Sequence, residues 1–357
     1  MTQLQKAILL LKEIKQHNHQ AYIVGGFVRD YLRGIQNPDI DICTSMDLDL
    51  LKQYFKVKEE HYGSTILMFH GSYFEVTTFR REIGSKQNRY PEKIIYTDTL
   101  EEDLKRRDFR MNAICMNEKR EIIDPLGGKD DVKRKQIVCI GDPSKRLEED
   151  ALRILRAIRF ATTLNFSLDS SLSEAIIQKR DLLKAISYQR KKEELNRIFS
   201  SSRAIQGRTL LIEHQLLDVL EIPNLKNAVF YSHPLLIWMQ LGVDEIYPFT
   251  KEEKKQMKYF RKCMEEPWNL YRIYESDLQT AILIGMMKGK GKEEIKILKN
   301  NLPIQNRQDI KITSDELQQF VPVEKISYNY KKIEQAILTG KLKNKKTDII
   351  EWLKKQK

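Results

Sequence analysis

Apolar residues are spaced differently in the two parts of this chain, and the spacing predicts a mixed N-terminal region followed by helices. Residues 21–24 (AYIV) form a short apolar run that ends at two glycines, as a buried strand would. Alternating apolar residues at 65–69 and 73–79, separated by residues 70–72, predict a hairpin. From Pro143 onward the apolar residues recur at helical spacing. We therefore expect an α+β protein, with a small mixed sheet first and only helices after it.

A turn at Gly25-Gly26 follows the first predicted strand, and residues 28–32 have the pattern of a helix start. A strand, a glycine turn and a helix N-terminus bring free backbone N–H groups together, and such groups favour a phosphate. Glycine also lets the backbone approach a ligand closely, because it has no Cβ. The simpler interpretation is that the two glycines form an ordinary turn.

Two aspartates, Asp39 and Asp41, come next, on a strand predicted over residues 38–43. Because side chains alternate along a strand, both carboxylates would leave the same face. Neighbouring carboxylates repel each other unless a cation lies between them, and hard divalent cations prefer oxygen ligands. Glu75, on the second hairpin strand, is either a third ligand or an ordinary solvent-facing residue. A phosphate-binding turn beside a metal-binding pair indicates phosphoryl or nucleotidyl transfer, although a solvated strand end is the simpler interpretation of the pair.

Residues 81–92 (REIGSKQNRYPE) are polar and show no periodicity, which predicts a loop. The length and charge of this segment suit a mobile flap over a nucleotide. A plain surface connection is the alternative.

Residues 145–161 (KRLEEDALRILRAIRFA) predict one amphipathic helix. Asp150 and Arg153 lie three positions apart and share a face of this helix, and Arg156 and Arg159 continue the row. An exposed, salt-bridged stripe is the simplest interpretation. Three arginines with few paired acids would repel one another unless an anion lies against them, so the row is also a candidate anion site.

Composition narrows the class of protein. The chain has 357 residues, of which 41% are hydrophobic and 31% charged, and it contains neither an apolar run of membrane-spanning length nor a signal-peptide core. Its four cysteines are scattered in apolar contexts, which predicts reduced thiols in a cytoplasmic protein. The net charge of +12 predicts a polyanionic partner. Nucleic acid fits better than a membrane surface, because no lipidation motif or strongly apolar helix face is present.

Five motifs occur in a fixed order: GGFVRD, DID, RRDFRMNAIC, DPLGG and EEDALRILRAIRFA. Together they make the chain resemble the class II CCA-adding enzymes and bacterial poly(A) polymerases, within the polymerase β-like nucleotidyltransferases. The resemblance is strong over residues 20–200 and weaker toward the C-terminus. It implies a seahorse-shaped protein with a nucleotidyltransferase head (1–142), a helical neck with a base-reading helix (143–203), a helical body (204–305) and a tRNA-binding helical tail (306–357).

The resemblance also implies site residues. Asp39 and Asp41 would bind Mg²⁺, with Glu75 as the further candidate. Gly26 and Arg29 would contact the nucleotide phosphates. The remaining implied nucleotide-binding residues are Arg107 against the incoming nucleotide, Asp150 and Arg153 against its base, and Arg156 and Arg159 nearby.

The base-reading role has a physical reason. Cytosine and adenine both present an exocyclic amine beside a ring-nitrogen acceptor, so a carboxylate accepts from the amine while a guanidinium donates to the ring nitrogen. Guanine and uracil present a carbonyl and an N–H instead, which reverses both contacts. Asp150 and Arg153 would therefore admit C and A without a nucleic-acid template.

The resemblance implies that the chain adds CCA to the 3′ end of tRNA from CTP and ATP, by two-Mg²⁺ nucleotidyl transfer with release of pyrophosphate. No obligate protein partner is evident. The full length of the 81–92 loop favours CCA over CC-only addition, and the absence of a long basic extension after the tail disfavours a dedicated poly(A) polymerase. A poly(A), A-adding or CC-adding polymerase of the same family is the alternative. An alternative of another class is a non-catalytic RNA-binding protein on this scaffold.

Overall fold

The computed structural model describes residues 1–61, 63–83, 93–231 and 233–355. The chain forms two compact units, one made of residues 1–226 with 246–248 and the other of residues 227–245 with 249–357. Each unit is described separately below. The domain boundaries expected at residues 142, 203 and 305 stay predictions.

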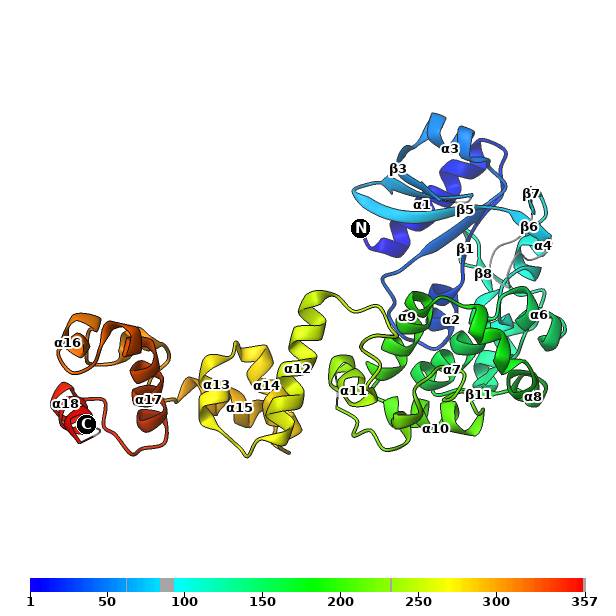
Figure 1. Cartoon of the computed structure of the whole chain (residues 1–357). Helices are drawn as coiled ribbons and strands as arrows, with labels where there is room; N and C mark the ends of the chain where they lie inside the picture. Colours follow the sequence, from blue (N-terminus) through cyan, green and yellow to red (C-terminus); the bar gives the residue numbers. More distant parts are fainter. Residues whose placement is uncertain (62, 84–92, 232, 356–357) are drawn as a thin grey trace. The chain divides into compact units, whose positions relative to one another are not determined.

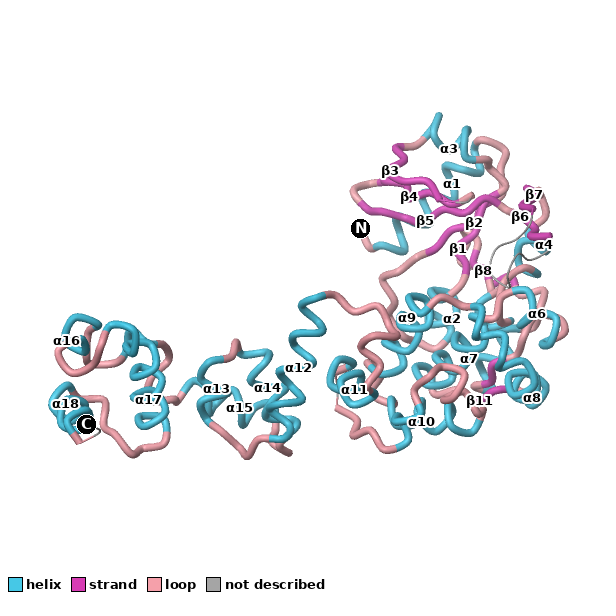
Figure 2. The backbone as a smooth tube through the Cα atoms, viewed as in Figure 1, coloured by secondary structure: helices cyan, strands magenta, loops and turns pink. Residues whose placement is uncertain are grey.

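A seven-stranded mixed sheet is the centre of the first part of the chain (Figures 1 and 2). Its strand order is β3-β4-β5-β2-β1-β8-β9. Strands β2 and β5 pair in parallel, and every other neighbouring pair is antiparallel. The strands are β1 (Ala21–Val24), β2 (Asp41–Thr44), β3 (Lys56–His61), β4 (Ser64–Phe69), β5 (Ser72–Thr78), β8 (Cys115–Met116) and β9 (Ile122–Ile123). The predicted first strand and the predicted hairpin are confirmed.

Five helices belong to the same region: α1 (Gln3–Gln16), α2 (Gly26–Leu32), α3 (Leu48–Tyr54), α4 (Leu100–Lys105) and α5 (Gly128–Arg134). Helix α1 buries Leu10, Leu11 and Ile14, which lie at helical spacing, so this face supplies part of the core. A further cluster of buried residues joins strands β1, β2 and β8 to helix α4. The sheet thereby holds the ends of β1 and β2 in fixed positions.

The first unit continues with helices α6 (Pro143–Glu149), α7 (Leu152–Leu164), α8 (Ser170–Lys179), α9 (Tyr188–Phe199) and α10 (Ala204–Glu213). Two short strands, β10 (Gln136–Ile137) and β11 (Ser167–Leu168), pair in parallel beside α7. Residues 246–248 also belong to this unit. Tyr247 is buried there, and its hydroxyl donates to the Leu220 carbonyl at 2.8 Å.

The prediction of a single helix over residues 145–161 is wrong, because the helix is interrupted at Asp150. Helix α6 ends at Glu149, and Asp150 has extended dihedral angles of φ −145° and ψ 101°. The Asp150 carboxylate accepts a hydrogen bond from the backbone N–H of Leu152 at 3.2 Å. Such a local side-chain acceptor competes with the helical hydrogen bond, so the helix restarts as α7.

The prediction of a loop over residues 81–92 is wrong for residues 81–83, which belong to a strand. Strand β6 (Arg80–Ile83) pairs antiparallel with β7 (Lys93–Tyr96). Residues 84–92 lie outside the described residues, so the flap expected there stays a prediction.

The second unit is helical. Its helices are α11 (Pro234–Leu241), α12 (Lys251–Glu265), α13 (Leu270–Glu275), α14 (Leu278–Met287), α15 (Lys292–Asn300), α16 (Ser314–Gln318), α17 (Ile326–Leu338) and α18 (Lys346–Lys354). The buried Glu334 of α17 accepts hydrogen bonds from the hydroxyls of Tyr271 and Tyr274 and from Arg307 Nε, which joins three segments of this unit. All four cysteines of the chain are buried free thiols, as predicted. Within the described ranges, none of the helices combines the length and the apolar character that crossing a bilayer requires.

Candidate active site

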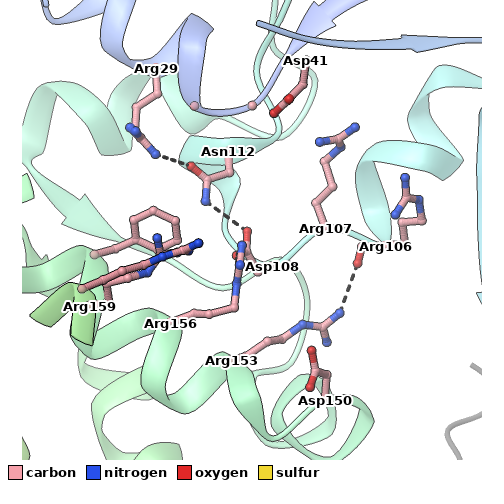
Figure 3. Close-up of a pocket in the computed structure, with 14 residues that line it drawn as sticks. Arg29, Asp41, Arg106, Arg107, Asp108, Asn112, Asp150, Arg153, Arg156 and Arg159 are labelled. Carbon is pink, nitrogen blue, oxygen red and sulfur yellow. Dashed lines mark hydrogen bonds and ion pairs between the residues drawn. The ribbon is translucent and has the colours of Figure 1, made fainter. Parts of the chain in front are cut away.

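A cavity of about 460 Å³ lies in the first unit, where the start of helix α2 and strand β2 face helix α7 (Figure 3). Seven arginines and three aspartates line it, so the cavity is strongly cationic. Such a lining suits a polyphosphate. The lining residues are Gly25, Gly26, Arg29, Asp41, Arg106, Arg107, Asp108, Asn112, Asp150, Arg153, Arg156, Arg159, Phe160 and Arg197.

The glycine turn lies next to the acidic end of the cavity. Gly25 has a φ of +82°, a backbone conformation that residues with a Cβ rarely adopt. A Cβ at this position would lie 3.6 Å from Asp41 Oδ2 and 3.9 Å from Arg107 Nη1, which are ordinary contact distances. Glycine is therefore required here by the backbone conformation rather than by lack of space. The turn brings the start of α2 against one carboxylate and one guanidinium.

Arg29 lines the cavity but is already held by protein groups. Its side chain is buried, and its Nε and Nη2 donate to the two carboxylate oxygens of Asp30 at 3.0 and 2.8 Å. Its Nη1 donates to Asn112 Oδ1 at 2.7 Å. The fork on Asp30 fixes the guanidinium plane at the wall of the cavity.

A chain of hydrogen bonds continues from Arg29 across the cavity to helix α7 (Figure 3). Asn112 Nδ2 donates to Asp108 Oδ1 at 3.1 Å, and Arg156 Nε donates to Asp108 Oδ2 at 2.8 Å. Burial by itself raises the pKa of Asp108, but the Arg156 guanidinium and the bonds from Asn112 and the Phe109 N–H hold that pKa at about 2. Asp108 is thus an ionised, fixed acceptor between two walls of the cavity.

Asp41 is the first residue of strand β2, and Glu75 is its partner in register on the parallel strand β5. Burial, together with the charges of Glu75 and Asp39, raises the pKa of Asp41 to about 6, although Arg107 acts in the opposite sense. The Asp41 carboxylate is therefore close enough to Glu75 and to Asp39 to be repelled by both. Asp39 is exposed and precedes the strand, so the strand predicted over residues 38–43 begins later than expected.

Glu75 lines a second, smaller cavity of about 220 Å³. Asp41, Arg106 and Arg107 line both cavities, so the two meet at Asp41. Asp39 lines neither. The structure thus places Glu75 beside Asp41, and its role as a ligand stays a prediction.

The fit of a divalent metal rests on this carboxylate group. Across the residues that the structure describes, no three His, Cys, Asp or Glu side chains gather closely enough to hold a metal ion by themselves. Mg²⁺ typically takes one or two protein carboxylates and completes its shell with water and substrate phosphates. The mutual repulsion at Asp41 is relieved when a cation binds. The residues therefore fit a metal that is shared with a nucleotide.

The arginines of helix α7 each have an acidic partner, so the expectation of few paired acids is wrong. The pairs are Arg153 with Glu149 at 3.1 Å, Arg156 with Asp108, and Arg159 with Glu194 at 2.7 Å. These acids come from α6, from the segment before residue 112 and from α9, so spacing along α7 could not reveal them. Arg159 also lies over the Phe160 ring at 4.0 Å, and burial lowers its pKa to about 10 although Glu194 acts in the opposite sense.

Asp150 and Arg153 both line the cavity, but their side chains are not bonded to each other. Arg153 Nη1 donates to the Arg146 carbonyl at 2.7 Å, and its Nη2 donates to the Arg106 carbonyl at 3.1 Å (Figure 3). A guanidinium has five N–H donors, so Arg153 keeps donors for a ligand beyond these bonds. The two side chains reach the cavity from separate elements rather than from one helix face.

Most of the predicted site residues meet in this cavity. Gly26, Arg29, Asp41 and Arg107 come from the head, and Asp150, Arg153, Arg156 and Arg159 come from α7 and the break before it. The sequence reasoning missed Arg106, Asp108, Asn112, Phe160 and Arg197 as lining residues. The polar run RRDFRMN was a signal for three of them. Nothing in the sequence indicated the aromatic ring under three arginines.

Family models match most of the chain. Residues 21–138 match the "Poly A polymerase head domain", residues 165–228 the "Probable RNA and SrmB- binding site of polymerase A", and residues 248–353 a tRNA nucleotidyltransferase domain 2. The chain is 35% identical to the CCA-adding enzyme of Bacillus velezensis, across 98% of this chain and 97% of that protein. The chain belongs to the CCA-adding enzyme family. The CCA-adding enzyme of Bacillus mycoides is 31% identical across 99% of both chains.

Solved CCA-adding enzymes share this fold. The Bacillus stearothermophilus enzyme, solved in complex with CTP, is 28% identical and superimposes with a TM-score of 0.84, covering 100% of this chain and 98% of that one. The Thermotoga maritima enzyme, solved with tRNA, is 21% identical, with a TM-score of 0.67 over 99% of this chain and 94% of that one, and supports the fold alone. The α+β fold and the family resemblance read from the motifs are confirmed.

Proposed function

We propose that this chain completes the 3′ end of tRNA by adding C, C and A from CTP and ATP without a template. The main support for this proposal is that a single cationic cavity is lined by the glycine turn, by Asp41 at the start of β2 and by the base-reading candidates Asp150 and Arg153. Membership of the CCA-adding enzyme family supports the same reaction.

The arginines near the glycine turn bind the triphosphate in this proposal. The start of α2 offers free backbone N–H groups, and Arg107 lies beside Gly25. Burial lowers the pKa of Arg107, but Asp103 together with Cys43 and Cys115 raises the pKa overall, so the guanidinium stays charged. Arg29 stays fixed by Asp30 and contributes positive charge at the cavity wall.

Asp41, with Asp39 and Glu75 as candidate partners, holds the divalent metal that the family indicates, and we propose Mg²⁺ because the donors are all hard oxygens. Held by these carboxylates, Mg²⁺ would supply the charge that lowers the pKa of the RNA 3′-hydroxyl and offsets the negative charge of the pyrophosphate. The protein side chains position the α-phosphorus in line with the attacking oxygen and stabilise the charge that develops.

Asp150 and Arg153 read the base. Asp150 Oδ1 is occupied by the Leu152 N–H, which leaves Oδ2 to accept from the amine of cytosine or adenine. Arg153 donates to the ring nitrogen. A uracil or guanine would place a carbonyl against the carboxylate and leave buried polar groups unpaired, which costs affinity.

The experiment is extension of a tRNA that lacks its CCA end, with one labelled nucleotide at a time. We expect CTP alone to add two residues, and ATP to add one residue only after CTP. Incorporation of A without C would instead identify a poly(A) or A-adding polymerase, and arrest after two C residues would identify a CC-adding enzyme. No incorporation at all, with intact tRNA binding, would favour a non-catalytic RNA-binding protein.

A further inference from the structure

The Asp150 carboxylate stands outside both neighbouring helices, at the edge of the cavity below Arg153 (Figure 3). Its Oδ1 accepts the Leu152 N–H at 3.2 Å. Among the described residues, its Oδ2 has no hydrogen-bond partner. A single backbone bond leaves the carboxylate free to turn about its side-chain torsions. A group that reads a base needs a second restraint.

Arg190 supplies a positive charge beside the Asp150 carboxylate. It lies in the first turn of helix α9, and its Nη1 is 3.7 Å from Asp150 Oδ1. This distance is too long for a hydrogen bond but within ion-pair range. The same Nη1 is buried and donates no hydrogen bond to any group in the described parts of the chain. Both side chains are 25% exposed, so solvent screens the pair only in part.

Helix α9, which carries Arg190, is held in place by buried side chains and by contacts to other segments of the first unit. Its Glu194 is buried and pairs with Arg159 of α7 at 2.7 Å, and its Lys192 Nζ donates to the Pro248 carbonyl at 2.8 Å. Leu195, Ile198 and Phe199 are completely buried on the same helix. The guanidinium therefore approaches Asp150 from an element whose position is fixed by packing on both sides.

We propose that Arg190 is a positioning residue for base selection: it holds the Asp150 carboxylate in the orientation that aims Oδ2 at the incoming base. This inference rests on the proposed base-reading role of Asp150. Arg190 does not line the cavity, so it acts on the nucleotide through Asp150 and not by direct contact. A merely structural ion pair would change stability and leave nucleotide preference unchanged.

The test compares wild type with Arg190→Met and Arg190→Lys, using tRNA that lacks CCA and each of the four nucleotides separately. We expect Arg190→Met to lower the ratio of kcat/KM for CTP over UTP by about tenfold, mainly through a higher KM for CTP. Arg190→Lys keeps a cation near the carboxylate and should restore most of the ratio. Lys184→Met, which removes a cation from an exposed pair with Asp181, is the matched control and should leave the ratio unchanged.

A double-mutant comparison separates positioning from general damage. In an Asp150→Ala background, Arg190→Met should cause no further fall in the ratio, because its target is gone. An unchanged ratio in Arg190→Met, or an equal fall with and without Asp150, would overturn the inference. If Arg190→Met does not fold, Arg190→Gln replaces it with the same expected loss. Failure of the wild type to incorporate C would contradict the proposed function instead, so the two failures are distinguishable.

Discussion

At the scale of single residues, the repulsion among the carboxylates at the end of β2 is the clearest chemical feature. The pKa of Asp41 is raised to about 6 because the residue is buried and faces Glu75 and Asp39. Two like charges are kept together at a cost in folding free energy, and such clusters are typical of functional sites.

Asp41→Asn should reduce nucleotide incorporation by at least about 100-fold, because it removes the proposed metal ligand beside the glycine turn. Binding of tRNA should stay within about twofold, since Asp41 makes no contribution to the cationic surface. Single-turnover extension and a filter-binding titration measure the two effects. Incorporation at the wild-type rate would remove Asp41 from the reaction.

Asp150→Ala should weaken the preference for C and A over U and G by about tenfold while changing tRNA affinity much less. The reason is that, in the proposed role, this side chain offers its second carboxylate oxygen to the base. Competition between CTP and UTP at equal concentration measures the preference. Equal losses in preference and in tRNA affinity would count against base reading.

The low pKa of Asp108 predicts a pH-dependent contribution to stability. Its folded value of about 2 lies below the ordinary 3.8, so the contribution is fully present above pH 4 and is lost as the pH falls toward 2. Asp108→Asn should therefore lower the free energy of unfolding by about 2 kcal/mol at pH 7 and by roughly half of that at pH 3. Urea unfolding at the two pH values provides the measurement. A loss that is the same at both would show that the charge of Asp108 is not the cause.

At the scale of helices and strands, local patterns predicted which elements exist but not where side chains find partners. The run 21–24 and the hairpin over 65–79 follow from alternation that needs no tertiary information. The break at Asp150 depends on one side-chain bond to Leu152, and an apolar pattern that continues across it conceals the break. Strand β6 has the sequence RREI, without apolar alternation, so this segment resembled the start of a loop.

The site was predictable where a motif lies within one segment, as with Gly26, Arg29 and Asp41. It was not predictable where partners are distant: Arg159 pairs with Glu194, and Arg29 bonds Asn112, which is 83 positions away. The shared helix face expected of Asp150 and Arg153 rested on a continuous helix. With the helix broken, each side chain has a different charged partner, namely Arg190 and Glu149.

The packing of helix α10 gives a stability prediction at the same scale. A Cβ on Gly207 would lie 2.5 Å from Ile198 Cγ2 and 2.9 Å from Thr162 Oγ1, both on buried residues of α9 and α7. Alanine favours a helix interior by about 1 kcal/mol, but overpacking a core costs about 1–3 kcal/mol. Gly207→Ala should thus lower the stability of the first unit by about 1 kcal/mol, measured by thermal unfolding. Adding Ile198→Ala should cost less than the sum of the two single changes, and strict additivity would contradict the proposed clash.

At the scale of the whole molecule, the net charge of +12 predicts electrostatic binding of a long polyanion. The KM for tRNA should rise by about tenfold or more between 50 and 200 mM salt, because each phosphate contact releases counterions. The KM for CTP should change less, since the proposed triphosphate site is a cavity lined by arginines. Initial rates at several salt concentrations test this, and equal salt dependence for both substrates would contradict it.

The central claim is that this chain builds a defined trinucleotide on tRNA. Mass spectrometry of tRNA lacking CCA, after incubation with the protein and all four nucleotides together, tests it most directly. We predict a product heavier by two cytidylates and one adenylate, with no further extension. A ladder of adenylates, a product that contains uridylate or guanylate, or unextended tRNA would contradict the account.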